Sequence, residues 1–166
     1  MRRRENPSGT EAENLLQPAF WESYTQLAGK AGENDLCRVS ECFTTKFQSL
    51  LFTYVSAEIA STPLLLTDTL PSDPTNAFLS CATFDLDSPH YAEILINTNY
   101  LLDPGDLIYV LLEEVIHIHQ YLRGDLFDDS LSYELRPHEI EAKRLAEEIA
   151  GFPRPHAVTK LLRVRP

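Results

Sequence analysis

The clearest hydrophobic periodicity in the chain lies in residues 103–124, DPGDLIYVLLEEVIHIHQYLRG. At about 100° per residue, the apolar side chains fall on one broad face of a helix and the polar side chains gather on the opposite face. Asp103 suits the N-cap, Pro104 the first helical position and Gly124 the end of the helix. The apolar face is expected to hold six residues: Ile108, Leu111, Leu112, Val115, Ile118 and Leu122. The sequence therefore predicts a helix of roughly 20 residues, with one side in the core and the other lining a cleft.

Weaker helical patterns lie on both sides of this segment. Residues 15–28 and residues 36–60 repeat apolar side chains every three or four positions, which predicts two helices in the first part of the chain. Residues 137–150 show the same spacing. They begin with Pro137 and are followed by Gly151; proline is common at the start of a helix and glycine just after its end. The sequence therefore predicts three further helices.

Strand-forming residues concentrate between these helical segments. Residues 77–84 and residues 92–98 are two short runs of this kind, joined by a polar connection, and they predict a small antiparallel sheet. Residues 1–14 are polar and lack apolar periodicity, so they are expected to be disordered. Residues 15–166 are then expected to form a single α+β domain, since the chain is long enough for one core.

Composition narrows the classes of function. The net charge is −11, which argues against a nucleic-acid binder because such proteins need a basic face, and also against attraction to anionic membranes. No apolar run approaches the ~20 residues that span a bilayer, and no apolar stretch follows the N-terminal arginines as in an export signal. The three cysteines, Cys37, Cys42 and Cys81, form no CxxC pair and are expected to be reduced. These features favour a cytoplasmic protein.

The polar face of the 103–124 helix carries the densest candidate chemistry. Glu113 and His117 are one helical turn apart, so their side chains lie one above the other and could share one metal ion. Glu114 would stand beside that ion as a carboxylate able to accept a proton from a bound water. Gln120, on the same face, could bond to a ligand or to substrate. The alternative interpretation is a solvated polar face, which is the commoner origin of such a run.

Further candidate groups open the 137–150 helix. Glu139 and Glu141 lie in its first turn, where carboxylates also interact favourably with the helix dipole. His138 points near the middle of the apolar face, so it is expected to be a partly buried structural residue. The other histidines are expected to be structural or exposed: His90, His119 and His156.

Two motifs together resemble a known group of enzymes. The run 113–117, EEVIH, resembles the HExxH helix of zinc metallopeptidases, with a glutamate in place of the first histidine. The run 139–142, EIEA, is similar to the ExEA pattern that supplies a later glutamate ligand. On these motifs, residues 92–153 resemble the gluzincin-type metallopeptidases, and most nearly the ImmA/IrrE-like bacterial peptidases.

The resemblance implies a fold and a set of site residues. The fold would be zincin-like, with a small antiparallel sheet packed on the active-site helix and on a second helix that bears a glutamate. Glu113 would be the first metal ligand, His117 the second and Glu139 the third, with Glu141 as the alternative third ligand. Glu114 would be the general base. The metal would be divalent, with zinc expected; manganese or iron are alternatives because a second carboxylate makes the site harder and more anionic.

Three functions from different classes follow. The first is a metal-dependent peptidase that hydrolyses peptide bonds of a protein or peptide substrate through a metal-bound water, with Glu114 as the base. The second is a catalytically inactive zincin-like module that binds or regulates a partner. The third is a helical di-metal protein, because Glu114 and His117 also form an ExxH pair; that architecture usually needs a second such pair, and the sequence has none.

Overall fold

The protein is described here by a computed structural model. It describes ten stretches of the chain: residues 18–27, 36–39, 48–49, 51–55, 64–67, 80–84, 92–97, 104–125, 127–128 and 130–151. The predicted disorder of residues 1–14 lies outside these stretches, as do His90 and His156. Among the described helices, none combines the length and the apolar character that crossing a bilayer requires.

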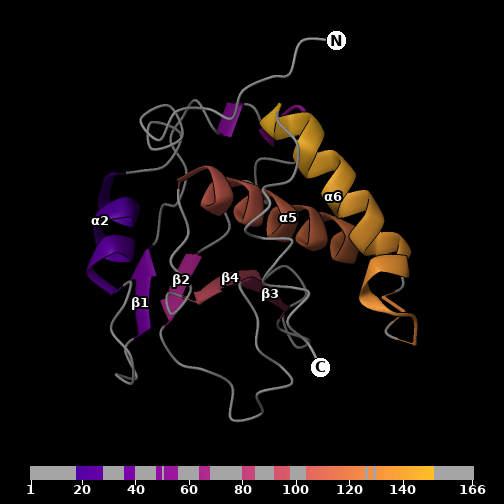
Figure 1. Ribbon diagram of the computed structural model, residues 1–166, viewed down its shortest axis with the longest axis horizontal. Coiled ribbons are helices and arrows are strands. Elements are labelled where there is room, and N and C mark those ends of the chain that lie inside the picture. The colour runs from indigo at the N-terminus through magenta and orange to yellow at the C-terminus, as the bar shows by residue number, and fades with distance from the viewer. Residues whose placement is uncertain are drawn as a thin grey trace.

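Along the described chain, one helix is followed by four short strands and then by two further α-helices (Figure 1). The elements are α2 (Pro18–Leu27), β1 (Leu36–Val39), β2 (Leu64–Thr67), β3 (Ser80–Phe84), β4 (Ala92–Asn97), α5 (Pro104–Arg123), the 3-10 helix η2 (Tyr133–Leu135) and α6 (Pro137–Ala150). Helix α5 contacts β3 and β4 on one side and α6 on another, whereas α2 contacts β1 and β2. Helix α5 is therefore the element that joins the sheet to the C-terminal helix.

The three helices predicted at residues 15–28, 103–124 and 137–150 are confirmed as α2, α5 and α6. Helix α5 starts at Pro104, where the missing backbone N–H costs nothing. The residues that follow α5 and α6 are Gly124 and Gly151, with φ angles of 84° and 77°. A side chain would be strained at such angles, so glycine is the residue that lets the chain turn away there.

The helix predicted across residues 36–60 is wrong at its start. Residues 36–39 form strand β1, which pairs antiparallel with β2. Residues 48, 49 and 51 are helical, and the intervening segments lie outside the described residues. A run of four residues carries too little periodicity to separate strand from helix, so the pairing with β2, which is distant in sequence, decides its state.

The four strands form one sheet in the order β1-β2-β4-β3. The two predicted strands pair antiparallel as β3 and β4, with Ala82 opposite Ile94. The prediction of an antiparallel sheet is nevertheless wrong for the whole, because β2 and β4 run parallel. Strand β3 lies between them in sequence but at the edge in space. Strand β3 runs opposite to β2, and β4 runs opposite to β3. Strand β4 therefore runs in the same direction as β2.

Helix α5 is buried on nearly all sides. Five of the six residues predicted to face the core are buried, and Leu107, Tyr109, Val110 and Ile116 are buried as well. Their side chains form one cluster with Ile94 and Ile96 of β4 and with residues of α2 and α6. The sixth predicted core residue, Leu122, is 38% exposed. Polar residues on α5 must therefore find partners inside the protein.

Replacing Leu111 with alanine should lower the free energy of unfolding by about 2–5 kcal/mol, because this fully buried side chain would leave a cavity. Leu122→Ala on the same helix is the matched control, and it should cost less than about 1 kcal/mol because Leu122 is partly exposed. Urea unfolding followed by far-UV circular dichroism measures both. Equal losses in the two variants would contradict the burial of this face.

Candidate metal centre

The connection between α5 and α6 brings the candidate residues of the two helices close to each other. At the end of α5, the backbone N–H groups of Gly124 and Asp125 bond to the carbonyls of Tyr121 and Gln120, both at 3.0 Å. The chain then returns through η2, and Pro137 opens α6 at the first helical position. Helices α5 and α6 pack against each other. The first turn of α6 thereby comes to lie beside the second half of α5.

His117 of α5 and Glu139 of α6 meet across this packing. The imidazole Nε2 of His117 lies 3.7 Å from the carboxylate Oε2 of Glu139, and both side chains are largely buried. This separation is too long for a hydrogen bond. Two ligand atoms that share one tetrahedral ion, each at about 2.1 Å, are about 3.4 Å apart. The pair is therefore spaced almost as two ligands of one metal ion would be.

Gln120 fixes the orientation of the His117 ring. Its amide Oε1 lies 2.9 Å from Nδ1 of His117, and its amide Nε2 donates to the His138 carbonyl at 2.9 Å and to Oε2 of Glu141 at 2.8 Å. The last two groups can only accept, so only this orientation of the amide satisfies all three contacts. In the neutral imidazole the proton is therefore on Nδ1. The lone pair is on Nε2, the atom that faces Glu139.

Glu141, the alternative third ligand, is occupied elsewhere. Its Oε2 accepts hydrogen bonds from Gln120 and from Arg123, each at 2.8 Å. The hydrogen bond from Gln120 is the largest influence and, with that from Arg123, lowers the pKa of the Glu141 carboxyl. Arg123 also pairs with Asp125. Two glutamates lie near the start of α6. Glu139 lies beside His117, whereas Glu141 bonds to Gln120 and Arg123 instead.

Glu114 points towards the sheet. Its carboxylate accepts hydrogen bonds from the hydroxyl of Ser80 and from the backbone N–H of Ala82, the latter at 2.7 Å. Burial is the largest influence on this group and raises its pKa, against the opposing effects of the charge of His117 and of the two donors. Glu114 therefore ties α5 to strand β3, and a carboxyl with a raised pKa is also better suited to exchanging a proton near neutral pH.

Glu113 is buried as well, one helical turn before His117 on α5. The alternative of a solvated polar face is therefore wrong for Glu113, Glu114 and Gln120, which are 6%, 8% and 0% exposed. Within the described stretches, no three His, Cys, Asp or Glu side chains gather closely enough around one point to hold a metal ion. The structure brings His117 and Glu139 together but does not assemble them with Glu113 as a finished triad.

His117 and Glu139 carry opposite charges. Burial lowers the pKa of His117, but the adjacent carboxylates of Glu139 and Glu114 outweigh it and raise the pKa to about 9. Burial raises the pKa of Glu139, but its contacts, chiefly with His117, outweigh that effect and lower the pKa. Without a metal ion, His117 and Glu139 are therefore an imidazolium and a carboxylate near neutral pH.

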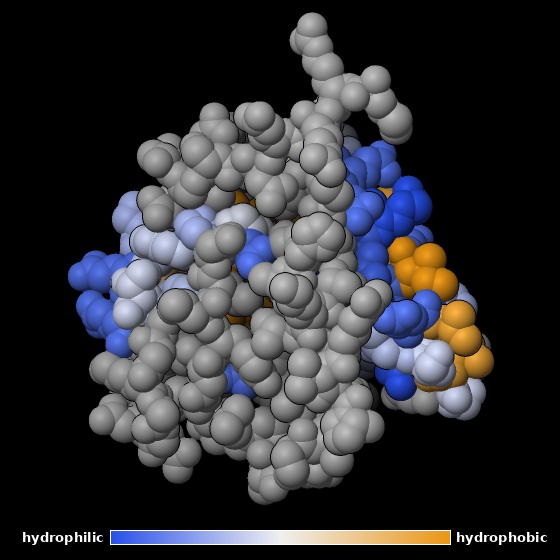
Figure 2. Space-filling view, viewed as in Figure 1, coloured by the Kyte–Doolittle hydropathy of each residue, from blue (hydrophilic) through white to orange (hydrophobic). Residues whose placement is uncertain are grey.

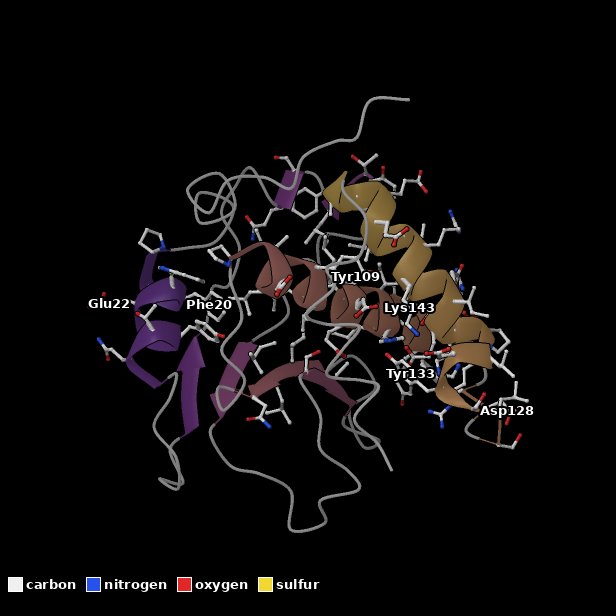
Figure 3. All side chains as sticks on the ribbon, viewed as in Figure 1. Phe20, Glu22, Tyr109, Asp128, Tyr133 and Lys143 are labelled. Carbon is white, nitrogen blue, oxygen red and sulfur yellow. The ribbon has the colours of Figure 1, made fainter. Side chains whose placement is uncertain are left out.

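Sequence reasoning missed several groups around Glu139. Lys143 lies 3.8 Å from Oε2 of Glu139 and stacks over the ring of Tyr133, with Nζ 3.9 Å from the ring centroid (Figure 3). The spacing of four residues between Glu139 and Lys143 was a readable signal for an ion pair on a helix. Ser80, which bonds to Glu114, carried no such signal, because it reaches α5 from a segment far away in the sequence.

The metal-free protein should lose stability as the pH rises from about 6.5 to about 9. The folded state raises the pKa of His117, so its stabilising contribution is complete below the unfolded pKa and is lost as the pH passes the folded one. The shift corresponds to about 3 kcal/mol in the free energy of unfolding. Urea unfolding at a series of pH values in the presence of a chelator measures it. His117→Gln should remove this dependence, and equal slopes in both proteins would contradict it.

Comparisons with models of known protein families, with curated protein sequences and with solved structures find no match to this chain. The assignment of a function therefore depends on the geometry of the chain's own residues.

Proposed function

We propose that this chain is a zincin-like, metal-dependent peptidase in which His117 and Glu139 bind one divalent ion. The observation that carries the proposal is the 3.7 Å separation of His117 Nε2 and Glu139 Oε2, with the opposite ring nitrogen held by Gln120. An imidazole and a carboxylate so placed on two packed helices match the ligand types that zinc prefers. Glu113 is the third ligand that the EExxH motif offers.

The charge of the site favours a cation. Glu113, Glu114 and Glu139 are all buried, and a buried carboxylate is costly unless a positive group balances it. In the metal-free state the proton on His117 and the ammonium group of Lys143 supply part of that balance. A divalent ion would replace this proton and add one more positive charge. When bound, such an ion lowers the pKa of a water molecule and polarises the carbonyl of a peptide bond.

Glu114 is the proposed general base. Ser80 and Ala82 hold its carboxylate in a fixed orientation, and each carboxylate oxygen keeps a second lone pair that can accept a proton. Burial raises the pKa of Glu114, against the opposing effects of His117 and the two donors, so a proton taken from water can be held and passed to the leaving amine. Gln120 keeps His117 oriented during this cycle.

A protein or peptide is the proposed substrate or partner. An open surface depression of about 710 Å³ lies at the start of α6, lined by Asp125, Pro137, His138, Ile140, Glu141 and Arg144. Exposed apolar side chains surround the start of α6 in sequence: Phe127, Leu131, Leu135 and Ile140. Figure 2 shows apolar surface between hydrophilic residues on the side of the molecule where α6 lies. A surface of this mixed kind suits contact with a polypeptide chain.

The alternative is a catalytically inactive zincin-like module that binds or regulates a partner. The observation that favours it is the position of Glu114, whose two carboxylate oxygens are both engaged by donors on β3. In this alternative Glu114 only ties α5 to the sheet. The two functions differ in whether Glu114 takes part in hydrolysis, and the binding module does not require a metal ion.

Metal analysis and peptide hydrolysis by variants of the full chain test the proposal. The wild type should bind about one zinc, manganese or iron ion per chain. Glu114→Gln should abolish hydrolysis of an unfolded protein substrate while the metal stays bound, because a proton acceptor is lost but no ligand. His117→Ala should lose both.

Glu148→Gln, on the exposed face of α6, is the control and should change neither property. Hydrolysis that survives Glu114→Gln would place the chemistry elsewhere. A wild type that binds metal without any hydrolysis would favour the binding module. A wild type that binds no metal would overturn the peptidase and leave the binding module as the better function.

A further inference from the structure

Four apolar side chains at the start of α6 face solvent. Leu135 of η2 and Ile140 of α6 are 63% and 52% exposed, and Phe127 and Leu131 of the connection before α6 are 37% and 38% exposed. Phe127 packs on the ring of His138, with centroids 4.7 Å apart, which places it against the first turn of α6. These four side chains are called the apolar patch. Figure 2 shows apolar surface among hydrophilic residues on this side of the molecule.

Charge is distributed unevenly between this region and the segment that follows it. Residues 122–151, which include the apolar patch, carry eight acidic and four basic residues. Two of the basic groups are already matched by carboxylates, because Arg123 pairs with two of them and Arg144 with a third. Residues 152–166 carry four basic residues and no acidic one, although the net charge of the chain is −11. The segment after α6 is therefore opposite in charge to the region around the patch.

We propose that residues 152–166 turn back along α6 and dock on the apolar patch, so that the chain covers its own patch. The segment has the chemistry that such a contact needs, since apolar side chains alternate with basic ones: Val158, Lys160, Leu161, Leu162, Arg163 and Val164. Its apolar side chains match the exposed leucines and isoleucine of the patch. Its basic side chains match the exposed carboxylates beside the patch, Asp128 and Glu134.

The segment is long enough for this contact. Helix α6 has 14 residues, and at about 1.5 Å per residue it is roughly 21 Å long. An extended chain advances about 3.3 Å per residue, so roughly six or seven residues cover that length. Gly151, with a φ angle of 77°, lets the chain leave the helix, and Pro153 disfavours a continuation of it. Residues 158–164 can therefore reach the start of α6.

Docking of this segment regulates the surface at the start of α6. That surface is the one proposed to contact a polypeptide, so a docked segment competes with the substrate or partner. A segment tethered beside its site acts at an effective concentration in about the millimolar range, so even a weak contact excludes a dilute competitor. The inhibition rests on the proposed function, whereas the docking does not.

Trypsin digestion of the folded full chain, followed by mass spectrometry, tests the docking. Cleavage after Lys160 requires a released segment, so its rate follows the released fraction. A docking equilibrium constant of about ten leaves roughly one segment in ten released, so Leu135→Asp and Ile140→Asp should each speed this cleavage several-fold, up to about tenfold. Phe52→Asp is the matched control, because Phe52 is 48% exposed and lies outside the patch, and it should leave the rate unchanged.

Charge provides a second test of the docking. Glu134→Lys should speed the cleavage after Lys160, because it places a positive charge beside a basic segment, whereas Glu22→Lys on the exposed side of α2 should not. Cleavage after the arginines of residues 2–4 in the same samples corrects for trypsin activity. Equal rates in the wild type and both patch variants, or protection that disappears on dilution, overturn docking within one chain and leave the proposed function standing.

Hydrolysis kinetics test the inhibition separately. Leu162→Asp should release the segment and lower KM for an unfolded protein substrate by up to about tenfold, with kcat unchanged, because access to the surface changes and the chemistry does not. Phe52→Asp should change neither constant. A KM that does not fall, although the patch variants release the segment, overturns the inhibition and keeps the docking. A chain without hydrolysis overturns the peptidase alone, since the trypsin rates still decide the docking.

Discussion

The structure depends on the burial of polar groups along helix α5. This helix crosses the interior and carries two adjacent glutamates and a glutamine into a region from which water is largely excluded. A buried carboxylate without donors or a balancing charge would cost several kcal/mol, which is a large part of the stability of a domain of this size. The neighbouring elements are therefore constrained not only by apolar packing but also by the requirement to place donors and charges opposite Glu113, Glu114 and Gln120.

Two elements meet this requirement in different ways. Strand β3 supplies neutral donors, a hydroxyl and a backbone N–H, to Glu114, and these contacts have fixed geometry and no charge of their own. Helix α6 supplies ionisable groups, which meet His117 and Gln120 at distances from 2.8 to 3.7 Å. Neutral donors fix a position, whereas ionisable groups can exchange a proton for a cation. The side of α5 that faces α6 is for this reason the side on which metal chemistry is proposed.

Local sequence signals predicted the parts of this arrangement that depend on neighbouring residues. Pro104 and Gly124 marked the ends of α5, and the spacing of Glu113 and His117 placed them on one face. Contacts between distant segments could not be read in the same way. The pairing of residues 36–39 with β2, the donors of β3 to Glu114 and the meeting of His117 with Glu139 depend on how separate elements pack, and no local period encodes that. The polar face was correctly identified, but its burial followed only from the packing of α6 and β3 against it.

Metal binding and helix packing are linked in this site because the proposed ligands come from two helices. His117 belongs to α5 and Glu139 belongs to α6, so an ion that binds both of them binds only the packed state of the two helices. Such an ion adds its binding free energy to the stability of that packing. Gln120 strengthens the link, since its single amide contacts the ring of His117 on α5 and the backbone of His138 and the carboxylate of Glu141 on α6. Loss of the amide would therefore disturb both ligand orientation and helix packing, and its effect on metal affinity would exceed that of one hydrogen bond.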